Sequence, residues 1–206
     1  YISYILKNPS KVKHLLDRRA FKLEPETVWE WYNHRRNQLK NIEPNPAHKA
    51  LVELESIVPE FTIITQNVDG LHTKAGNQNV IEIHGNIWQV KCTECEHVSE
   101  NYELKISIPP KCPQCSGLLR PNVVLIGEAI PSKKLESAKY IISQCDFMLI
   151  VGMSGLIQSG VSLAMLADKE GLFIVEVNTE KTVFSDIADV TLLGKATEVL
   201  PSIISL

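Results

Sequence analysis

Two Cys-x-x-Cys pairs constrain the fold of this chain more than any other feature. Cys92-Thr-Glu-Cys95 and Cys112-Pro-Gln-Cys115 are separated by 16 residues, a spacing typical of four-cysteine zinc sites. Each pair brings two thiolates to one side of a tight turn, and two such turns supply the four ligands of a tetrahedral site. Four protein ligands leave zinc no open position, so the expected metal is structural and not catalytic.

Two disulfides are the alternative interpretation of the same cysteines. Disulfides belong mainly to secreted proteins, and no charged-then-apolar leader opens this sequence, so the spacing favours metal. The fifth cysteine, Cys145, stands alone beside an apolar run, and we expect it to be a small buried residue without chemistry.

The remaining composition is that of one globular unit. The 206 residues are 44% hydrophobic and carry a formal net charge of -3, which gives no electrostatic reason to expect nucleic acid or an anionic membrane as the main partner. No apolar run reaches the roughly 18 to 20 residues that span a bilayer. We expect an intracellular monomer. Because the sequence starts at Tyr1 without an initiator Met, mitochondrial and cytoplasmic locations both stay open.

Helical and strand patterns alternate along the rest of the chain. The apolar spacing predicts helices over 28–39, 47–58, 132–144, 160–169 and 195–205, and Asn45-Pro46 is expected to start the second of them. Apolar runs predict strands at 61–65, 80–83, 122–126, 147–151, 172–177 and 190–193, several of them too continuous for half-exposed strands. The predicted fold is α/β: a Rossmann-like, doubly wound parallel sheet formed by 1–87 and 118–206, with a small zinc-ribbon domain inserted at 88–117.

Polar or small residues follow three of these strands directly. In such sheets ligands bind beyond the carboxyl ends of the strands. Turn formation alone would explain any one of these ends, but three together favour a nucleotide-sized crevice. The residues are Gln66, Asn67 and Asp69 after the first strand, Gly152 and Ser154 after another, and Asn178 after a third.

Two histidines compete for the role of general base. His84 follows a predicted strand, and the unperturbed pKa of histidine lies near 6.5, which suits proton transfer near neutral pH. His72 follows the Gln66–Asp69 loop and competes on spacing alone. A lone histidine is more often structural than catalytic, and His48, just after Pro46, could simply start a helix.

The motifs TQNVDGLHTKAG, IEIHG, the two Cys-x-x-Cys pairs, LLRPNVVLIGEAIP, VGMSG, VEVNTE and GKATEVLP occur in the order found in the sirtuins. The sequence thus resembles this family of NAD-dependent protein lysine deacylases from about Val28 to its C-terminus. The resemblance implies that NAD is consumed as a co-substrate. The products are then nicotinamide, O-acyl-ADP-ribose and the free lysine of an acyl-lysine protein or peptide.

The resemblance also implies a role for each matching residue. His84 matches the catalytic base, which acts on a ribose hydroxyl. Asn67 and Asp69 match residues of the nicotinamide pocket. Val124 matches the strand that pairs with the substrate peptide. The residues that match NAD contacts are Gln66, Gly152, Ser154 and Asn178, and those that match the structural zinc ligands are Cys92, Cys95, Cys112 and Cys115.

Tyr32 and Arg35 point to a subclass. They match the Tyr-x-x-Arg pair of class III sirtuins, whose pocket accepts malonyl, succinyl or glutaryl lysine, because Arg can hold a carboxylate bidentately while Tyr donates a hydrogen bond. A solvated basic helix face is the alternative from spacing alone. Within a sirtuin the acyl pocket is favoured, although acetyl-lysine stays a possible substrate.

The sequence departs from the family at several places. Sirtuins open with a strand followed by a Gly-Ala-Gly-x-Ser phosphate loop and a segment ending in Phe-Arg. Neither motif occurs in this sequence, which leaves open a truncated chain and a protein without the loop. Met153 stands where Thr is usual, the segment 158–160 stands where Pro-Ala is common, and Ile126 replaces an aromatic residue. Two alternative functions therefore stay open: an NAD-consuming ADP-ribosyltransferase or NAD hydrolase, and an inactive zinc-stabilised binding module.

Overall fold

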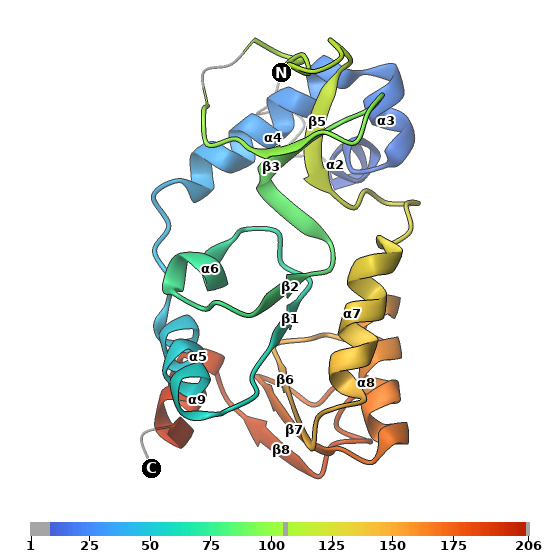
Figure 1. The fold of residues 1–206 in the computed structure, drawn as a ribbon. Coiled ribbons are helices and arrows are strands. Elements are labelled where there is room, and N and C mark those ends of the chain that lie inside the picture. The colour runs from blue at the N-terminus through green and yellow to red at the C-terminus, as the bar shows by residue number, and fades with distance from the viewer. Residues whose placement is uncertain (1–8, 105–106, 205–206) are drawn as a thin grey trace. The chain divides into compact units, whose positions relative to one another are not determined.

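The fold was analysed in a computed structural model that describes residues 9–104 and 107–204 (Figure 1). The chain forms two compact units. Unit 1 contains the described residues up to Ile42, Asn67–Gly70 and His84–Ile130. Unit 2 contains Glu43–Gln66, Leu71–Ile83 and the described residues from Pro131 onward.

Unit 1 combines three helices with an antiparallel sheet. The helices are α2 (Pro9–Leu15), α3 (Arg18–Leu23) and α4 (Pro25–Leu39), and the strands, in sheet order, are β4 (Val98–Glu100), β3 (Gly85–Cys92) and β5 (Leu119–Val123). Asp17 caps α3, because its side chain accepts a hydrogen bond from the backbone N–H of Arg19. Pro25 occupies the first turn of α4, where a missing N–H costs nothing.

Two buried side chains of α4 tie the helices of unit 1 to its sheet. Trp29 Nε1 donates to the carbonyl of Leu119 at 2.8 Å. Arg36 is fully buried and donates from Nε to the carbonyl of Ile87 at 2.7 Å and from Nη1 to Asn101 Oδ1 at 2.9 Å. Burial lowers the pKa of Arg36 to about 10. The zinc insert predicted at 88–117 is therefore not a separate domain: it lies within unit 1, and Arg36 of α4 bonds to it at Asn101.

Unit 2 contains the parallel strands. Strands β1 (Ile63–Thr65) and β2 (Val80–Glu82) form one parallel pair, and β6 (Phe147–Val151), β7 (Phe173–Asn178) and β8 (Val190–Leu193) form a three-stranded parallel sheet. The helices of this unit are α5 (Pro46–Ile57), α6 (Leu71–Ala75), α7 (Ser132–Ile142), α8 (Gln158–Glu170) and α9 (Ala196–Ile204). No helix of the described residues is long and apolar enough to cross a membrane.

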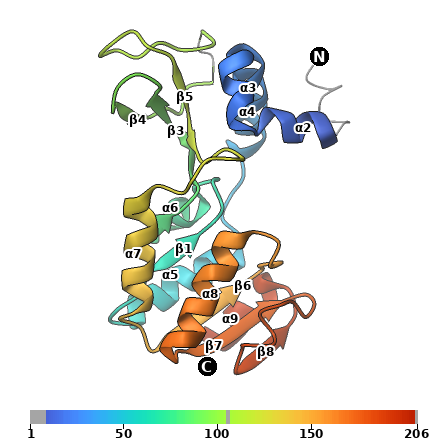
Figure 2. The same cartoon turned by 90° about the vertical axis from the view of Figure 1, so that its right-hand side faces the viewer.

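Helices cover both faces of the β6-β7-β8 sheet, as the doubly wound prediction requires (Figure 2). Helices α7 and α8 pack side by side on one face, and α5 packs on α9 on the other. On the α5/α9 face, Val175 and Val177 contact Ala47, Ala50 and Leu200 in one apolar cluster. Residues 174–177 of β7 are all buried, which explains why this strand is apolar except at Glu176, whose carboxylate accepts hydrogen bonds from Thr182 Oγ1 and Ser185 Oγ.

One predicted strand is wrong in position and in direction. The run 122–126 was assigned to the parallel sheet, but the strand is β5, which ends at Val123 and pairs antiparallel with β3. An apolar run indicates burial and does not identify the strand beside it. The parallel strands also form two ladders, since no strand in the described part of the chain joins β1 to β6.

Candidate active site and metal centre

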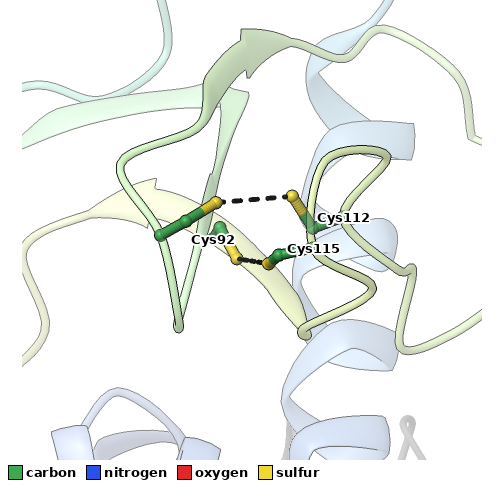
Figure 3. Close-up of side chains that lie close together, drawn as sticks. Cys92, Cys112 and Cys115 are labelled. Atoms are coloured by element: carbon green, nitrogen blue, oxygen red, sulfur yellow. Dashed lines mark hydrogen bonds between the residues drawn. The ribbon is translucent and has the colours of Figure 1, made fainter.

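The four cysteines converge at one point of unit 1 (Figure 3). Cys92 ends β3, Cys95 follows in the same turn, and the other pair lies in the turn before β5. All four Sγ atoms lie within 4.8 Å of one another; Cys92 and Cys115 are 3.4 Å apart, and Cys95 and Cys112 are 3.7 Å apart. Zinc–sulfur bonds of about 2.3 Å in a tetrahedron put sulfurs about 3.8 Å apart, so this cage fits structural zinc.

The thiols of this cluster are free, and none forms a disulfide. Burial raises the pKa of Cys92, but backbone N–H groups of Glu94 and Cys95 donate to its sulfur and bring the pKa down to about 7. The N–H of Glu94 lies 3.3 Å from that sulfur. Backbone donors aimed at a thiolate are what a zinc ligand needs, because the ligand binds in its deprotonated form.

The loop Asn67–Gly70 and His84 both belong to unit 1, where strands hold their backbones. Ile87 N–H donates to the carbonyl of Val68 at 2.8 Å, and Trp88 Nε1 donates to the carbonyl of Asp69 at 2.9 Å. His84 is half-buried in the turn between β2 and β3, and its carbonyl accepts from Val124 N–H at 2.8 Å. The Asn67–Gly70 loop and His84 therefore both lie at the beginning of the same strand, β3.

Three strand ends meet in unit 2. Gln66, which follows β1, donates from Nε2 to Ser159 Oγ at 3.0 Å. Asn178, the last residue of β7, donates from Nδ2 to the carbonyl of Met153 in the loop after β6 at 2.8 Å. Gly152 and Ser154 are exposed in that same loop. The carboxyl ends of β1, β6 and β7 thus carry the small and amide-bearing residues that the sequence places there.

Two of the departures from the sirtuin pattern are in contact. A Cβ added to Gly160 would lie 2.1 Å from Met153 Cε and 2.8 Å from Gln66 Nε2. The Met153 side chain therefore occupies space that any larger residue at position 160 would fill.

The three histidines weighed as candidates lie in different surroundings. His48 is part of a capping box at the start of α5, where Asn45 Oδ1 accepts from its backbone N–H at 3.1 Å. The His72 ring lies 4.8 Å from the His48 ring, between centroids, within unit 2. His72 is thus a local packing partner, whereas His84 belongs to unit 1.

Tyr32 and Arg35 lie one turn apart on α4 in different environments. The Tyr32 side chain is 3% exposed, and burial raises its pKa well above the ordinary value of 10. Arg35 is exposed, with its guanidinium carbon 6.0 Å from the centre of the Trp31 ring and Nη1 donating to Gln38 Oε1 at 3.0 Å. Residues three positions apart differ by about 60° around the axis of a helix. Tyr32 therefore lies within the buried face of α4, whereas Arg35 lies at the edge of that face.

Sequence reasoning missed one charged pair beside the predicted substrate segment. Arg120 and Glu128 lie on either side of Val124, and both oxygens of the carboxylate accept from the guanidinium. The available signal was a pair of opposite charges flanking an apolar run.

Comparison with known proteins places this geometry in a family. Residues 6–159 match the Sir2 family. A protein from Pyrococcus abyssi (strain GE5 / Orsay) named NAD-dependent protein deacylase is 42% identical over 205 residues, covering 97% of this chain and 82% of the relative. A crystal structure of a Sir2 homologue in complex with NAD has a TM-score of 0.89 at 39% identity, covering 94% of this chain and 76% of that one.

A structure of Sir2 bound to an acetylated peptide is also similar, with a TM-score of 0.85 at 30% identity, and covers 93% of this chain and 82% of that one. The family match spans the predicted base, the nicotinamide-pocket loop and all four metal ligands. The chain belongs to the Sir2 family, the sirtuins.

Proposed function

We propose that this chain removes acidic acyl groups (malonyl, succinyl or glutaryl) from protein lysines. The broader activity follows from the family: the chain is an NAD-dependent protein deacylase. Acyl-lysine in a peptide or protein is then the second substrate, as the Sir2 structure with an acetylated peptide supports.

The environment of Arg35 carries the acyl assignment. Its guanidinium lies over the Trp31 ring and donates a hydrogen bond to Gln38 Oε1, and among the described residues it forms no ion pair with a carboxylate. A guanidinium in that state retains the forked donors that hold a carboxylate in two parallel hydrogen bonds. Tyr32, one turn away, supplies a phenol that burial keeps protonated at neutral pH.

In this proposal the residues of the chain divide the work as follows. NAD supplies the ribose carbon that the acyl oxygen attacks and the nicotinamide that leaves. His84 takes the proton from a ribose hydroxyl, with its backbone fixed by Val124 N–H. Asn67 and Asp69 line the nicotinamide pocket, and their loop is fixed through Val68 and Asp69 carbonyls. The residues proposed to contact NAD from unit 2 are Gln66, Gly152, Ser154 and Asn178.

One kinetic comparison tests the acyl assignment. We would measure kcat/KM on succinyl-lysine and acetyl-lysine forms of one peptide for wild type, Arg35→Met and the control Arg19→Met. Arg19 is an exposed arginine of the same unit, so its loss changes net charge equally. A hydrogen bond to a charged group is worth about 1.5–3 kcal/mol, so Arg35→Met should lower the succinyl reaction roughly 10- to 150-fold. The acetyl reaction and Arg19→Met should change little; an equal loss on both peptides would refute the assignment of Arg35.

A second measurement separates deacylation from the other NAD-consuming chemistries. Nicotinamide should be released only when acylated peptide is present, and His84→Ala should abolish that release. Release of nicotinamide without acylated peptide would favour the NAD hydrolase or ADP-ribosyltransferase alternative.

A further inference from the structure

Arg120 is a nearly buried cation whose donors converge on one short segment. Its residue is 8% exposed on β5. Nη1 donates to Glu128 Oε1 at 2.5 Å, and Nη2 donates to Glu128 Oε2 at 3.0 Å and to the carbonyl of Val123 at 2.8 Å. The guanidinium carbon lies 5.8 Å from the centre of the Phe21 ring. One side chain therefore binds both the end of β5 and the residue that closes the following loop.

Glu128 fixes the same loop from its other end. Its Oε2 also accepts from Leu125 N–H at 2.9 Å, and its own N–H donates to the carbonyl of Leu125 at 2.9 Å. On the outer side, Ile126 N–H donates to the carbonyl of Leu16 at 2.7 Å, and Arg18 N–H donates to the carbonyl of Ile126 at 3.1 Å. Three consecutive amides, 124–126, thus have three different fixed acceptors.

The first of those amides reaches the predicted catalytic base. Val124 N–H donates to the carbonyl of His84 at 2.8 Å, so the loop and the backbone of His84 are one hydrogen-bonded structure. Beyond the effect of burial, the charges of the pair act on the Tyr32 phenol in opposite directions: Arg120 lowers its pKa and Glu128 raises it. Two of the bonds of this pair fix backbone positions directly: Arg120 Nη2 holds the carbonyl of Val123, and Glu128 Oε2 holds the N–H of Leu125.

We propose that Arg120 and Glu128 are positioning residues that clamp residues 124–128 and, through Val124, hold the backbone of His84 in register with the substrate segment. The proposal rests on the proposed function, since it is that function which makes Val124 part of a substrate segment. The fork of the guanidinium is essential, because three acceptor oxygens in fixed places need more than one nitrogen. Breaking either half also leaves the other charge partly buried without its partner.

A kinetic experiment tests the clamp. We would compare wild type, Arg120→Lys and Glu128→Gln with the control Lys195→Gln, which removes one exposed partner of the Lys195–Glu198 pair in unit 2. Small misplacement of reacting groups costs up to about a hundredfold in rate, so kcat/KM for the acyl-lysine peptide should fall about tenfold in both clamp variants, with KM for NAD nearly unchanged. Arg120→Lys should show this loss although lysine keeps the positive charge. An unchanged kcat/KM for the peptide in both clamp variants, or an equal rise in KM for NAD, would mean a merely structural role and would overturn the proposal.

Hydrogen exchange tests the clamp independently of activity. In Arg120→Lys the amides of Val124 and Leu125 should exchange faster than in wild type, while amides of β7 in unit 2 and all amides in Lys195→Gln keep their protection. Unchanged protection of Val124 and Leu125 in both clamp variants would overturn the clamp. A wild-type protein that deacylates nothing would instead refute the proposed function, and the exchange measurement would still decide the clamp.

Discussion

Replacing Gly85 by Ala should destabilise unit 1 strongly, because the added methyl group has no space. Gly85 begins β3 directly after His84 and has φ +86°. A Cβ built there would lie 2.0 Å from the carbonyl oxygen of Asn122 and 3.0 Å from Val123 Cα. Both are backbone atoms of β5, which pairs with β3 at this point, so neither can rotate away as a side chain would.

The expected loss of stability has two causes, and the same substitution at a second glycine, Gly127, separates them. An L-residue in the left-handed region costs about 1–2 kcal/mol, and forcing extra volume into packed structure costs about 1–3 kcal/mol more, so Gly85→Ala should lower the free energy of unfolding by about 2–5 kcal/mol. Gly127 has φ +84° in the same unit, but a Cβ there would meet only the Arg18 side chain, at 3.6 Å or more. Gly127→Ala should therefore show the first part alone.

Urea unfolding of the zinc-loaded proteins, followed by tryptophan fluorescence, measures this difference. The three tryptophans of the chain, Trp29, Trp31 and Trp88, all belong to unit 1, so their emission reports on that unit. If Gly85→Ala proved no less stable than Gly127→Ala, the close approach of β3 and β5 beside His84 would be wrong.

Two further predictions concern the metal and pH. The purified protein should contain one zinc per chain. Cys115→Ser should lose the metal, and Cys145→Ser should keep it. Chelation should lower the melting temperature of unit 1, because zinc binding in small modules is worth on the order of 10 kcal/mol. Retention of full zinc by Cys115→Ser would contradict the cage. Partial burial alone would raise the pKa of Glu128, but hydrogen bonds from Arg120 and Leu125 outweigh it and hold that pKa below its ordinary 4.5. The stabilisation by Glu128 is thus present above about pH 4.5 and lost as pH falls through the depressed folded pKa. In thermal melts the stability advantage of wild type over Glu128→Gln should shrink as pH falls below that range, and a constant difference would refute the linkage.

Features that depend on local sequence were predicted well. The helix start at Asn45-Pro46 needs only a capping side chain and a proline, and α5 begins there. Strands β6 and β8 have the predicted bounds, 147–151 and 190–193, because each coincides with one short continuous apolar run. The zinc cage follows from two local turns. For the helix start, the strands and each Cys-x-x-Cys turn, the residues that determine the structure are neighbours in the chain.

Features that depend on distant partners were not predicted. The antiparallel pairing of β5 with β3 joins residues about 30 positions apart, and its apolar sequence suited a parallel sheet equally well. The burial of Arg36 depends on the carbonyl of Ile87, 51 positions away, which no spacing rule connects to α4. Arg120 and Glu128 are only eight positions apart, but their pairing requires the turn that Gly127 makes at φ +84°. The roles of His84, Asn67 and Asp69 in the reaction stay predictions that the kinetic experiments test.

Met153 and Gly160 show why departures from a family pattern have to be judged together. Each looks unfavourable alone: Met153 places a long apolar side chain in a loop proposed to contact NAD, and Gly160 weakens the first turn of α8. In the structure the terminal methyl group of Met153 lies within 2.1 Å of where a Cβ of residue 160 would be, so the larger residue requires the smaller one. Gln66 lies at the same place and bonds to Ser159, so the end of β1 is held by the first turn of α8, which contains Gly160. Met153 and Gly160 therefore compensate for each other, and neither residue taken alone indicates loss of the NAD site.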